Sequence, residues 1–245
     1  MKYFRSLVIF FIGLNINQVH GKNLDYFLKS NGDEFNYFIQ TAASLGIQKE
    51  KVSNIMTSTE QNSPMTITAG FAFFPSSIEK LSLLATGSLS YIVPSDIKEE
   101  GGSTFSNNTK LDPETGFSFH AHKSYTYRNV TGFFGGLDHE VFYLYNTPDF
   151  LGSGKELKSV TQKITYGTLG LAFAQKFFTP FVFKMSASQS FSSKTGLKGQ
   201  RYLIDYSQKY SENMWYHIFV KRHELQDDSR ELKITRLGVG VGFYY

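Results

Sequence analysis

The amino-acid sequence predicts an all-β protein, in which a single antiparallel sheet closes into an up-and-down transmembrane β-barrel of about ten strands. Three observations carry this prediction. Apolar and polar side chains alternate along most of the chain, and the links between the alternating segments differ systematically in length. The segments are near or above the roughly 9–11 residues that a tilted spanning strand needs. Strands of soluble proteins are shorter, about 5–6 residues, so segment length favours a membrane.

The composition agrees with a barrel and excludes a bundle of membrane-spanning helices. The 245 residues include 25 basic and 21 acidic side chains, and the hydrophobic fraction is 41%. The mean hydropathy of −0.25 is too low for several apolar helices. Aromatic residues reach 16%, as alternating lipid-facing and water-facing strands would produce. The chain has no cysteine, so disulfides cannot support the fold.

The N-terminus has the organisation of a secretory signal peptide. Lys2 and Arg5 supply a positive region, and Leu7–Leu14 form an uninterrupted apolar run. Val19 and Gly21 place small or modest side chains at positions −3 and −1, which predicts cleavage after Gly21. The apolar run is far shorter than the roughly 20 residues of a spanning helix. A fully embedded amphipathic anchor is the alternative interpretation.

The segment LKITRLGVGVGFYY at the C-terminus shows the clearest alternation. One face carries Thr235, Leu237, Val239, Val241, Phe243 and Tyr245, and the other carries Arg236, Gly238, Gly240, Gly242 and Tyr244. The first face suits lipid and the second suits a crowded interior. An amphipathic last strand that ends in an aromatic residue resembles the C-terminal signature of bacterial outer-membrane β-barrel proteins. This resemblance implies that Val241, Phe243 and Tyr245 form an assembly signal. The last strand of a soluble sheet is the alternative.

Eight further segments repeat the alternation. In one of them, for example, Phe117 and Phe119 lie opposite His120 and His122. The segments are Thr66–Phe74, Lys80–Val93, Gly116–Tyr127, Val130–Tyr145, Ser159–Ala174, Phe178–Ser192, Gln200–Tyr210 and Met214–His223. With the last strand they make nine, although single-chain bacterial barrels have an even number of strands.

The links between these segments indicate an orientation. If the C-terminus lies at the periplasmic rim, every outer link is longer than every inner link, as expected for surface loops and periplasmic turns. The expected outer links are Leu225–Arg230, Ser193–Gly199, Asn146–Lys158 and Pro94–Thr115. The expected inner links are Glu212–Asn213, Gln175–Phe177, Arg128–Asn129 and Pro75–Glu79.

This scheme requires a tenth strand before Thr66. Phe35–Ala43 alternates and is the candidate, which leaves Leu45–Met65 as another long outer loop. In the alternative, Leu24–Met56 is helical and the barrel has eight strands. The expected division is a signal peptide at residues 1–21, a periplasmic N-terminal segment at 22–34 and a barrel at 35–245.

The alternation also predicts which side chains face the lumen. They are His120, His122, Lys184, Arg201, Asp205, Lys209, His217, Lys221, His223 and Arg236. A barrel of about ten strands is close to the size that side chains can fill, and buried charges must be paired. One interpretation is therefore a polar network that closes the lumen. The other is a constricted, somewhat cationic channel that prefers anions.

No motif in the sequence specifies catalysis or a cofactor. His120 and His122 share a face at a spacing that can bind a metal, but no third ligand can be placed. Ser124 lies on the same face, which is a weak match to a serine hydrolase. We therefore expect no catalytic residue, no metal site and no cofactor.

The functional expectation is an integral protein of the outer membrane of a Gram-negative bacterium, acting as a small passive pore or as a structural or surface protein. The alternatives are a hydrolase of outer-membrane lipid, or an adhesin that acts through long outer loops such as Pro94–Thr115. The expected partners are outer-membrane lipid and lipopolysaccharide, the barrel-assembly machinery and small solutes. Nucleic acid is not expected, because the chain is exported.

Overall fold

The structure is a computed structural model, and it describes residues 34–52, 55–75, 77–78, 81–100, 104–105, 111–124, 129–145, 160–175, 180–211 and 213–244. The predicted signal peptide and residues 22–33 lie outside this range. The strands are β1 (Glu34–Val52), β2 (Ile55–Phe74), β3 (Leu81–Glu99), β4 (Thr104–Phe105), β5 (Glu114–Ser124), β6 (Asn129–Leu144), β7 (Val160–Gln175), β8 (Phe181–Ser193), β9 (Lys198–Lys209), β10 (Met214–Gln226) and β11 (Arg230–Tyr244).

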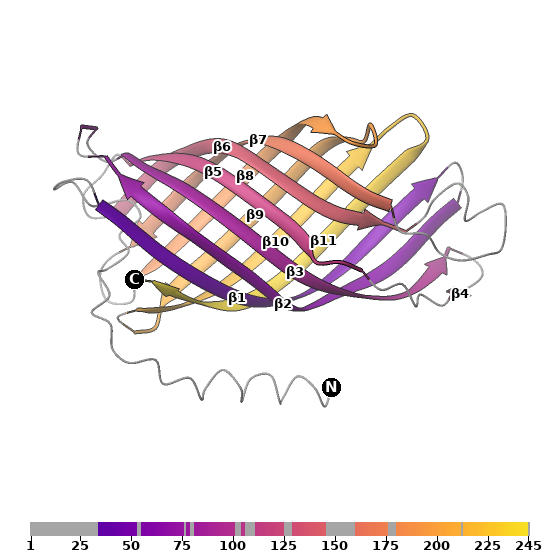
Figure 1. The fold of residues 1–245 in the computed structure, drawn as a ribbon, viewed down its shortest axis with the longest axis horizontal. Helices are drawn as coiled ribbons and strands as arrows, with labels where there is room; N and C mark the ends of the chain where they lie inside the picture. Colours follow the sequence, from indigo (N-terminus) through magenta and orange to yellow (C-terminus); the bar gives the residue numbers. More distant parts are fainter. Residues whose placement is uncertain are drawn as a thin grey trace.

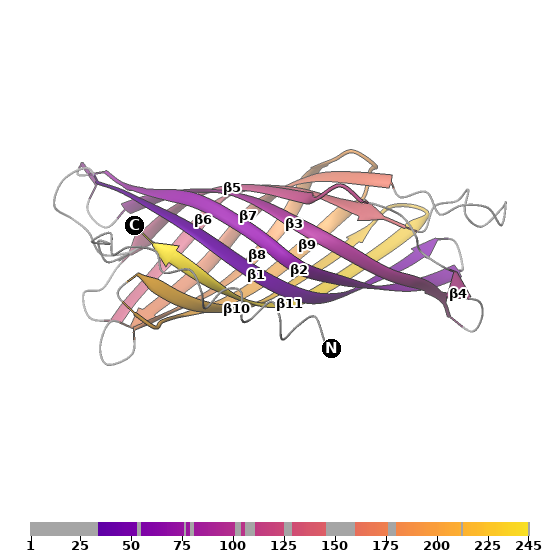
Figure 2. The same cartoon turned by 60° about the horizontal axis from the view of Figure 1, so that its bottom comes forward.

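Ten of these strands form one closed antiparallel barrel, which confirms the predicted fold and strand number. Each of the ten pairs with its neighbours in the chain, β3 with β5 included, and β1 pairs with β11 to close the sheet. The short β4 pairs only with the end of β3. The strands run obliquely around an elongated barrel, as Figures 1 and 2 show. The eight-strand alternative is wrong, because residues 34–52 form β1 and not part of a helix.

Two rims are defined by the strand ends. The inner rim contains the start of β1 and the end of β11, where Phe38 pairs with Tyr244. The outer rim contains the other ends of these strands, where Val52 pairs with Arg230. The labels follow the predicted orientation, in which the C-terminus faces the periplasm.

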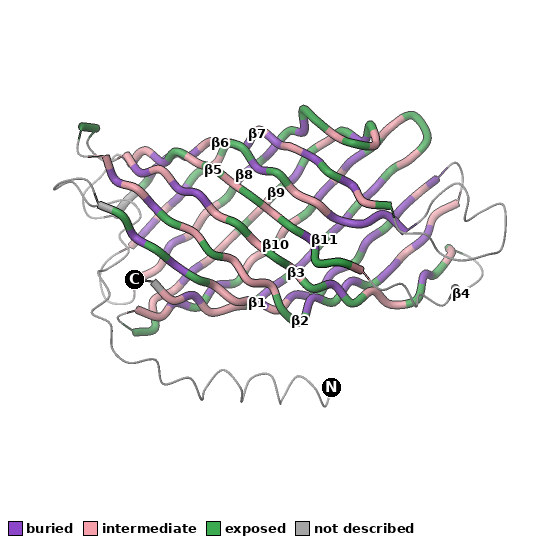
Figure 3. Tube along the Cα trace, in the orientation of Figure 1, coloured by how far each residue is buried: buried purple, intermediate pink, exposed green. Residues whose placement is uncertain are grey.

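Burial alternates along the strands, because successive side chains of a strand point to opposite faces of the sheet. Along β1, Phe35, Tyr37 and Ile39 are exposed, whereas Asn36 and Phe38 are buried. Figure 3 shows this alternation around the barrel. The result is a broad belt of exposed apolar side chains, which includes Leu45, Met65, Phe71, Leu89, Phe117, Phe133, Leu137, Leu169, Leu171, Ile204, Ile218, Val220, Leu237 and Val239.

The two edges of this belt differ in chemistry. At the inner rim, aromatic rings pair on the outer surface: Phe35 stacks on Phe73 at 4.7 Å, and Tyr210 lies 5.1 Å from Tyr216. Aromatic girdles of this kind mark the membrane interface of β-barrels. Towards the outer rim the outward side chains become charged, as at Lys51. An apolar belt bounded in this way has the arrangement of a membrane-facing surface.

The outer rim differs from the sequence-based expectation, because its strands are longer and its links shorter. The expected loop Leu45–Met65 instead forms the outer halves of β1 and β2, which pair as far as Val52 and Ile55. Residues 94–99 of the expected loop Pro94–Thr115 belong to β3. Residues 194–197 connect β8 to β9, and 227–229 connect β10 to β11.

The physical reason is that alternation continues through the segment assigned to a loop. Leu45 and Ile47 are exposed on the outer surface, whereas Gln48 and Glu50 are buried. The polar inward residues gave no hydrophobic signal, but they find hydrogen-bond partners across the lumen. Because β2 has 20 residues and is tilted relative to the barrel axis, it extends roughly 50 Å along that axis. This is about twice the height of a typical apolar belt, so the outer halves project beyond it.

Two clusters of buried apolar side chains lie towards the two ends of the barrel. The inner cluster contains Phe38, Ala72, Phe74, Leu84, Phe134, Ala172, Ala174, Val182 and Trp215. The outer cluster contains Phe142, Leu144, Ile164, Tyr166, Leu197, Leu225, Leu232 and Ile234. Polar side chains occupy the middle of the lumen between them. No helix in the part of the chain that the structure describes is long and apolar enough to cross a membrane.

Candidate functional site in the barrel lumen

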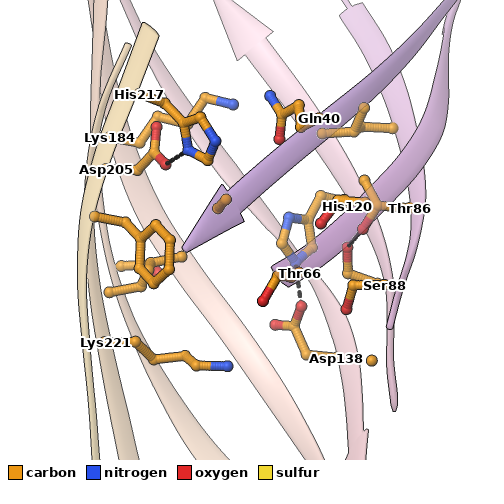
Figure 4. A pocket seen from close by; sticks show the side chains of 18 of the residues that line it. Gln40, Thr66, Thr86, Ser88, His120, Asp138, Lys184, Asp205, His217 and Lys221 are labelled. Atoms are coloured by element: carbon orange, nitrogen blue, oxygen red, sulfur yellow. Dashed lines mark hydrogen bonds and ion pairs between the residues drawn. The ribbon is translucent and has the colours of Figure 1, made fainter. Parts of the chain in front are cut away.

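A cavity of about 290 Å³, lined by both polar and apolar side chains, lies in the lumen. One wall, formed by β1, β2 and β3, presents uncharged groups such as Gln40, Thr66 and Ser88. The facing wall, formed by β8, β9 and β10, presents charged groups such as Lys184 and Asp205. Figure 4 shows these two walls facing each other. The arrangement follows from the alternation, because the inward positions that line the cavity are uncharged on β1, β2 and β3, whereas β8, β9 and β10 contribute Lys184, Arg201, Asp205 and Lys221.

The charged wall is organised around Asp205. Asp205 and Lys184 are directly paired across β8 and β9. His217 of β10 lies with its Nδ1 3.9 Å from an Asp205 carboxylate oxygen. Ser207 donates a hydrogen bond to the same carboxylate over 3.0 Å. The lysine, carboxylate and imidazole therefore form one local cluster, in which opposite charges lie together within the barrel wall.

On the opposite side of the cavity, His120 of β5 contacts Asp138 of β6. The His120 Nε2 lies 3.1 Å from an Asp138 carboxylate oxygen, as the dashed line in Figure 4 marks. Gly136 permits this close approach of β5 to β6, because a Cβ at residue 136 would lie 2.7 Å from the His120 ring. The His122 ring instead stacks on Phe134 at 4.9 Å.

A first ionic layer crosses the lumen at Arg201 of β9. Its guanidinium donates to Asp138 over 2.5 Å and to Glu140 over 2.6 Å. Both carboxylates belong to β6, which is separated from β9 by two strands. Lys221 donates to the other Glu140 oxygen over 3.2 Å, and the His223 ring lies 3.4 Å from it. These charges neutralise one another inside the barrel, as buried charges require.

A second ionic layer crosses the lumen at Arg236 of β11. Its guanidinium binds Glu114 of β5 through two hydrogen bonds of 2.5 and 2.9 Å. The same group donates to the Gln61 side chain over 2.6 Å. Three strands separate β11 from β5 around the barrel, so this bidentate pair spans the interior. Bidentate arginine–carboxylate pairs are among the strongest and most directional hydrogen-bonded contacts.

Above these layers, hydrogen bonds tie β1 to β6 across the outer mouth. The Gln48 side chain donates to the Tyr143 carbonyl over 3.0 Å, and the Tyr145 amide donates to the Glu50 carboxylate over 2.8 Å. The last residues of β6 are therefore buried on both faces. Burial also raises the pKa of the Tyr145 phenol, which follows β6, so this side chain stays neutral.

Eight of the ten predicted lumen residues line the cavity: His120, His122, Lys184, Arg201, Asp205, His217, Lys221 and Arg236. His223 is buried beside Glu140, whereas Lys209, at the inner end of β9, is not among the residues that line the cavity. The structure also brings four carboxylates into the lumen that the sequence-based set lacked, namely Glu50, Glu114, Asp138 and Glu140. Glu50 and Glu114 belong to segments assigned to loops. Asp138 and Glu140 could have been found, since they alternate with Leu137 and His139. With these acids included, the interior is no longer cationic.

The residues predicted to form an assembly signal belong to β11, which closes the barrel by pairing with β1. Val241 pairs with Thr41, and Phe243 pairs with Ile39. Both side chains are partly exposed on the outer surface. Tyr245 lies outside the described residues.

The catalytic and metal hypotheses gain no support from this geometry. Ser124 is the last residue of β5, at the inner rim, and is only 2% exposed. A hydrolase of outer-leaflet lipid would need its nucleophile at the opposite rim. Within the described ranges, no group of three or more histidine, aspartate or glutamate side chains is arranged to hold a metal ion.

Comparison with known proteins shows similarity of fold and not of sequence. No protein-family model matches this chain, and no curated protein is similar to it. Among solved structures, the outer membrane protease OmpT from Escherichia coli covers 94% of this chain and 99% of its own, with 10% identity and a TM-score of 0.52. The β domain of the Bordetella autotransporter BrkA has 9% identity, covers 86% of this chain and 99% of its own, and has a TM-score of 0.45. The similarity to OmpT is therefore one of fold alone.

Proposed function

We propose that this chain is an integral protein of the bacterial outer membrane whose barrel is closed to solutes, and that it serves a structural or surface role. One observation carries the proposal. The guanidinium–carboxylate contacts of Arg201 and Arg236 span the lumen, and the outer apolar cluster lies beyond them. An ion that crossed the barrel would have to break paired charges and then enter a layer that offers it no hydration, which is very unfavourable.

The belt of exposed apolar side chains supports the membrane location. Leu169 is 76% exposed and Leu45 is 64% exposed, although both are large and hydrophobic. Contiguous apolar patches of such extent are rare on soluble monomers. A closed barrel satisfies all of its backbone hydrogen bonds within the sheet, so it can place this belt in lipid.

Ion conductance across a planar bilayer tests the closed lumen. Residues 22–245 would be refolded in detergent, and a heat-dependent gel shift would first show that a barrel has formed. We expect the refolded protein to insert without discrete conductance steps. Reproducible steps would overturn the closed-barrel proposal and favour the passive pore.

Single-cysteine labelling tests the location and the orientation, since the chain has no cysteine of its own. Asp228→Cys lies in the turn between β10 and β11 at the outer rim, and Ser211→Cys lies between β9 and β10 at the inner rim. A maleimide that cannot cross membranes should label Asp228→Cys in intact cells. It should label Ser211→Cys only after the outer membrane is permeabilised. The reverse pattern would invert the orientation, and labelling of neither after permeabilisation would contradict the location.

A further inference from the structure

The charged outer surface above the apolar belt divides into two sectors of different character. In one sector, on β1, β2, β3, β10 and β11, basic side chains lie beside acidic ones. The pairs are Lys51 with Glu231, Lys98 with Glu60, Arg222 with Glu224, and Lys233 with Glu231, with separations of 2.5 to 4.0 Å. The positive charge of this sector is largely offset within the protein.

The other sector, on β7, β8 and β9, carries basic side chains alone. Lys163, Lys194 and Lys198 are exposed there, and within the described parts of the chain none of them forms an ion pair. The Lys194 amide donates to the Lys163 carbonyl over 2.9 Å, so these two residues are direct neighbours. Lys198 begins the next strand, four residues after Lys194. We call these three residues the basic sector.

The surface below the basic sector is strongly apolar. Phe191 is 60% exposed, Leu169 is 76% exposed, and Tyr202 adds an aromatic ring that is 40% exposed. Between them, Gly167 leaves the sheet surface open, since a Cβ there would have only the Phe191 ring within 4 Å. Exposed cations thus stand directly above a belt suited to acyl chains.

We propose that the basic sector binds the phosphate groups of a phosphorylated outer-leaflet lipid, while the surface around Gly167 and Leu169 accommodates its acyl chains. Charge complementarity selects this occupant, because three cations without acidic partners attract an anion that is held at the membrane surface. The proposal rests on the proposed membrane location and orientation, which place the outer rim in the outer leaflet.

The test compares two triple variants that remove the same amount of charge. Lys163→Gln, Lys194→Gln and Lys198→Gln together remove the basic sector. Lys51→Gln, Lys98→Gln and Lys233→Gln together remove three lysines that have acidic neighbours. Exposed substitutions of this kind leave stability nearly unchanged, and the heat-dependent gel shift would verify folding of both variants.

Binding of lipid A to the full-length barrel in detergent would be measured by fluorescence titration, with phosphorylated and dephosphorylated lipid A as probes. We expect the parent to prefer the phosphorylated form, and the basic-sector variant to bind it roughly a hundredfold more weakly. The control variant should differ from the parent by only a few fold. Equal weakening in both variants would overturn the proposal in favour of general charge attraction, as would a parent indifferent to phosphate. Because binding is measured in detergent, these outcomes are independent of the cysteine-labelling result.

Discussion

At the scale of the residue, Arg201 is the most connected side chain of the lumen. It is 4% exposed, it contacts two carboxylates, and its guanidinium lies 5.0 Å from the centre of the Tyr166 ring. The same guanidinium also donates hydrogen bonds to the hydroxyls of Thr168 and Ser188. Removing one member of such a buried network is costly, because the remaining charged groups stay buried with fewer partners.

We therefore expect Arg201→Ala to lower the free energy of unfolding by about 3–5 kcal/mol, because it removes the guanidinium that pairs with both Asp138 and Glu140. Urea unfolding of the barrel in lipid vesicles, followed by the gel shift, would measure this change.

Arg222→Ala is the matched control, since Arg222 pairs with Glu224 at an exposed site. This substitution should cost less than about 1 kcal/mol. If both variants lost the same stability, the ionic layer at Arg201 would have no special structural importance.

At the scale of the element, the outer ends of β1, β2 and β6 change the character of the barrel. β1 and β2 continue as a paired hairpin beyond the apolar belt, and the end of β6 contributes Phe142 and Leu144 to the outer cluster. Residues 142–145 are all buried, so the strict alternation of β6 ends where lipid no longer covers one of its faces. At the outer end of the barrel, side chains on both faces of β6 are thus buried by protein, as in the core of a soluble domain.

Glu50 joins these elements, because it accepts the Tyr145 amide. We expect Glu50→Ala to speed hydrogen exchange of the Tyr145 amide by roughly tenfold or more, since a buried donor loses its acceptor. Exchange measured by mass spectrometry on the folded barrel would show the effect.

Glu60→Ala provides the comparison, since Glu60 lies on β2 with its side chain exposed near Lys98. Exchange at residue 145 should be unchanged in this variant. Equal exchange rates in the Glu50 variant and the parent would mean that the mouth is held by other contacts.

At the scale of the whole molecule, the barrel exists only when its first and last strands meet. The β1–β11 seam is continuous from Phe38 and Tyr244 to Val52 and Arg230. The backbone N–H and C=O groups that β1 and β11 direct towards each other are hydrogen-bonded only when these two strands pair. An open sheet would expose a long unpaired edge, which is not tolerated in lipid.

Deletion of Phe243–Tyr245 should therefore sharply reduce the amount of heat-modifiable barrel recovered from the outer membrane. The deletion removes the pairings of Ile39 with Phe243 and of Phe38 with Tyr244, together with the proposed assembly signal. Membrane fractionation with the gel shift would measure the loss.

Tyr244→Ala keeps the strand pairings and the proposed assembly signal, because the sequence alternation puts residue 244 on the face opposite to Val241 and Phe243. This variant should assemble nearly as well as the parent. Normal assembly of the deletion variant would contradict the proposed signal.

The sequence by itself determined the class of fold, favoured ten strands over eight, and indicated the side of the sheet for residues in its alternating segments. This was possible because side chains alternate between lipid and lumen along every strand, and that alternation is visible in a few consecutive residues. His217 and Arg236, for example, were assigned to the lumen from their immediate neighbours.

Only the tertiary structure decided which charged side chains meet in the lumen and that their charges balance. Arg236 meets Glu114 across 122 residues, and Gln48 meets Tyr143 across 95. No local pattern contains such pairings, because they depend on which strands face each other after closure. The outer halves of β1 and β2 were missed for a related reason. Their inward side chains are polar, so the hydrophobic signal disappears where hydrogen bonds across the lumen replace apolar packing.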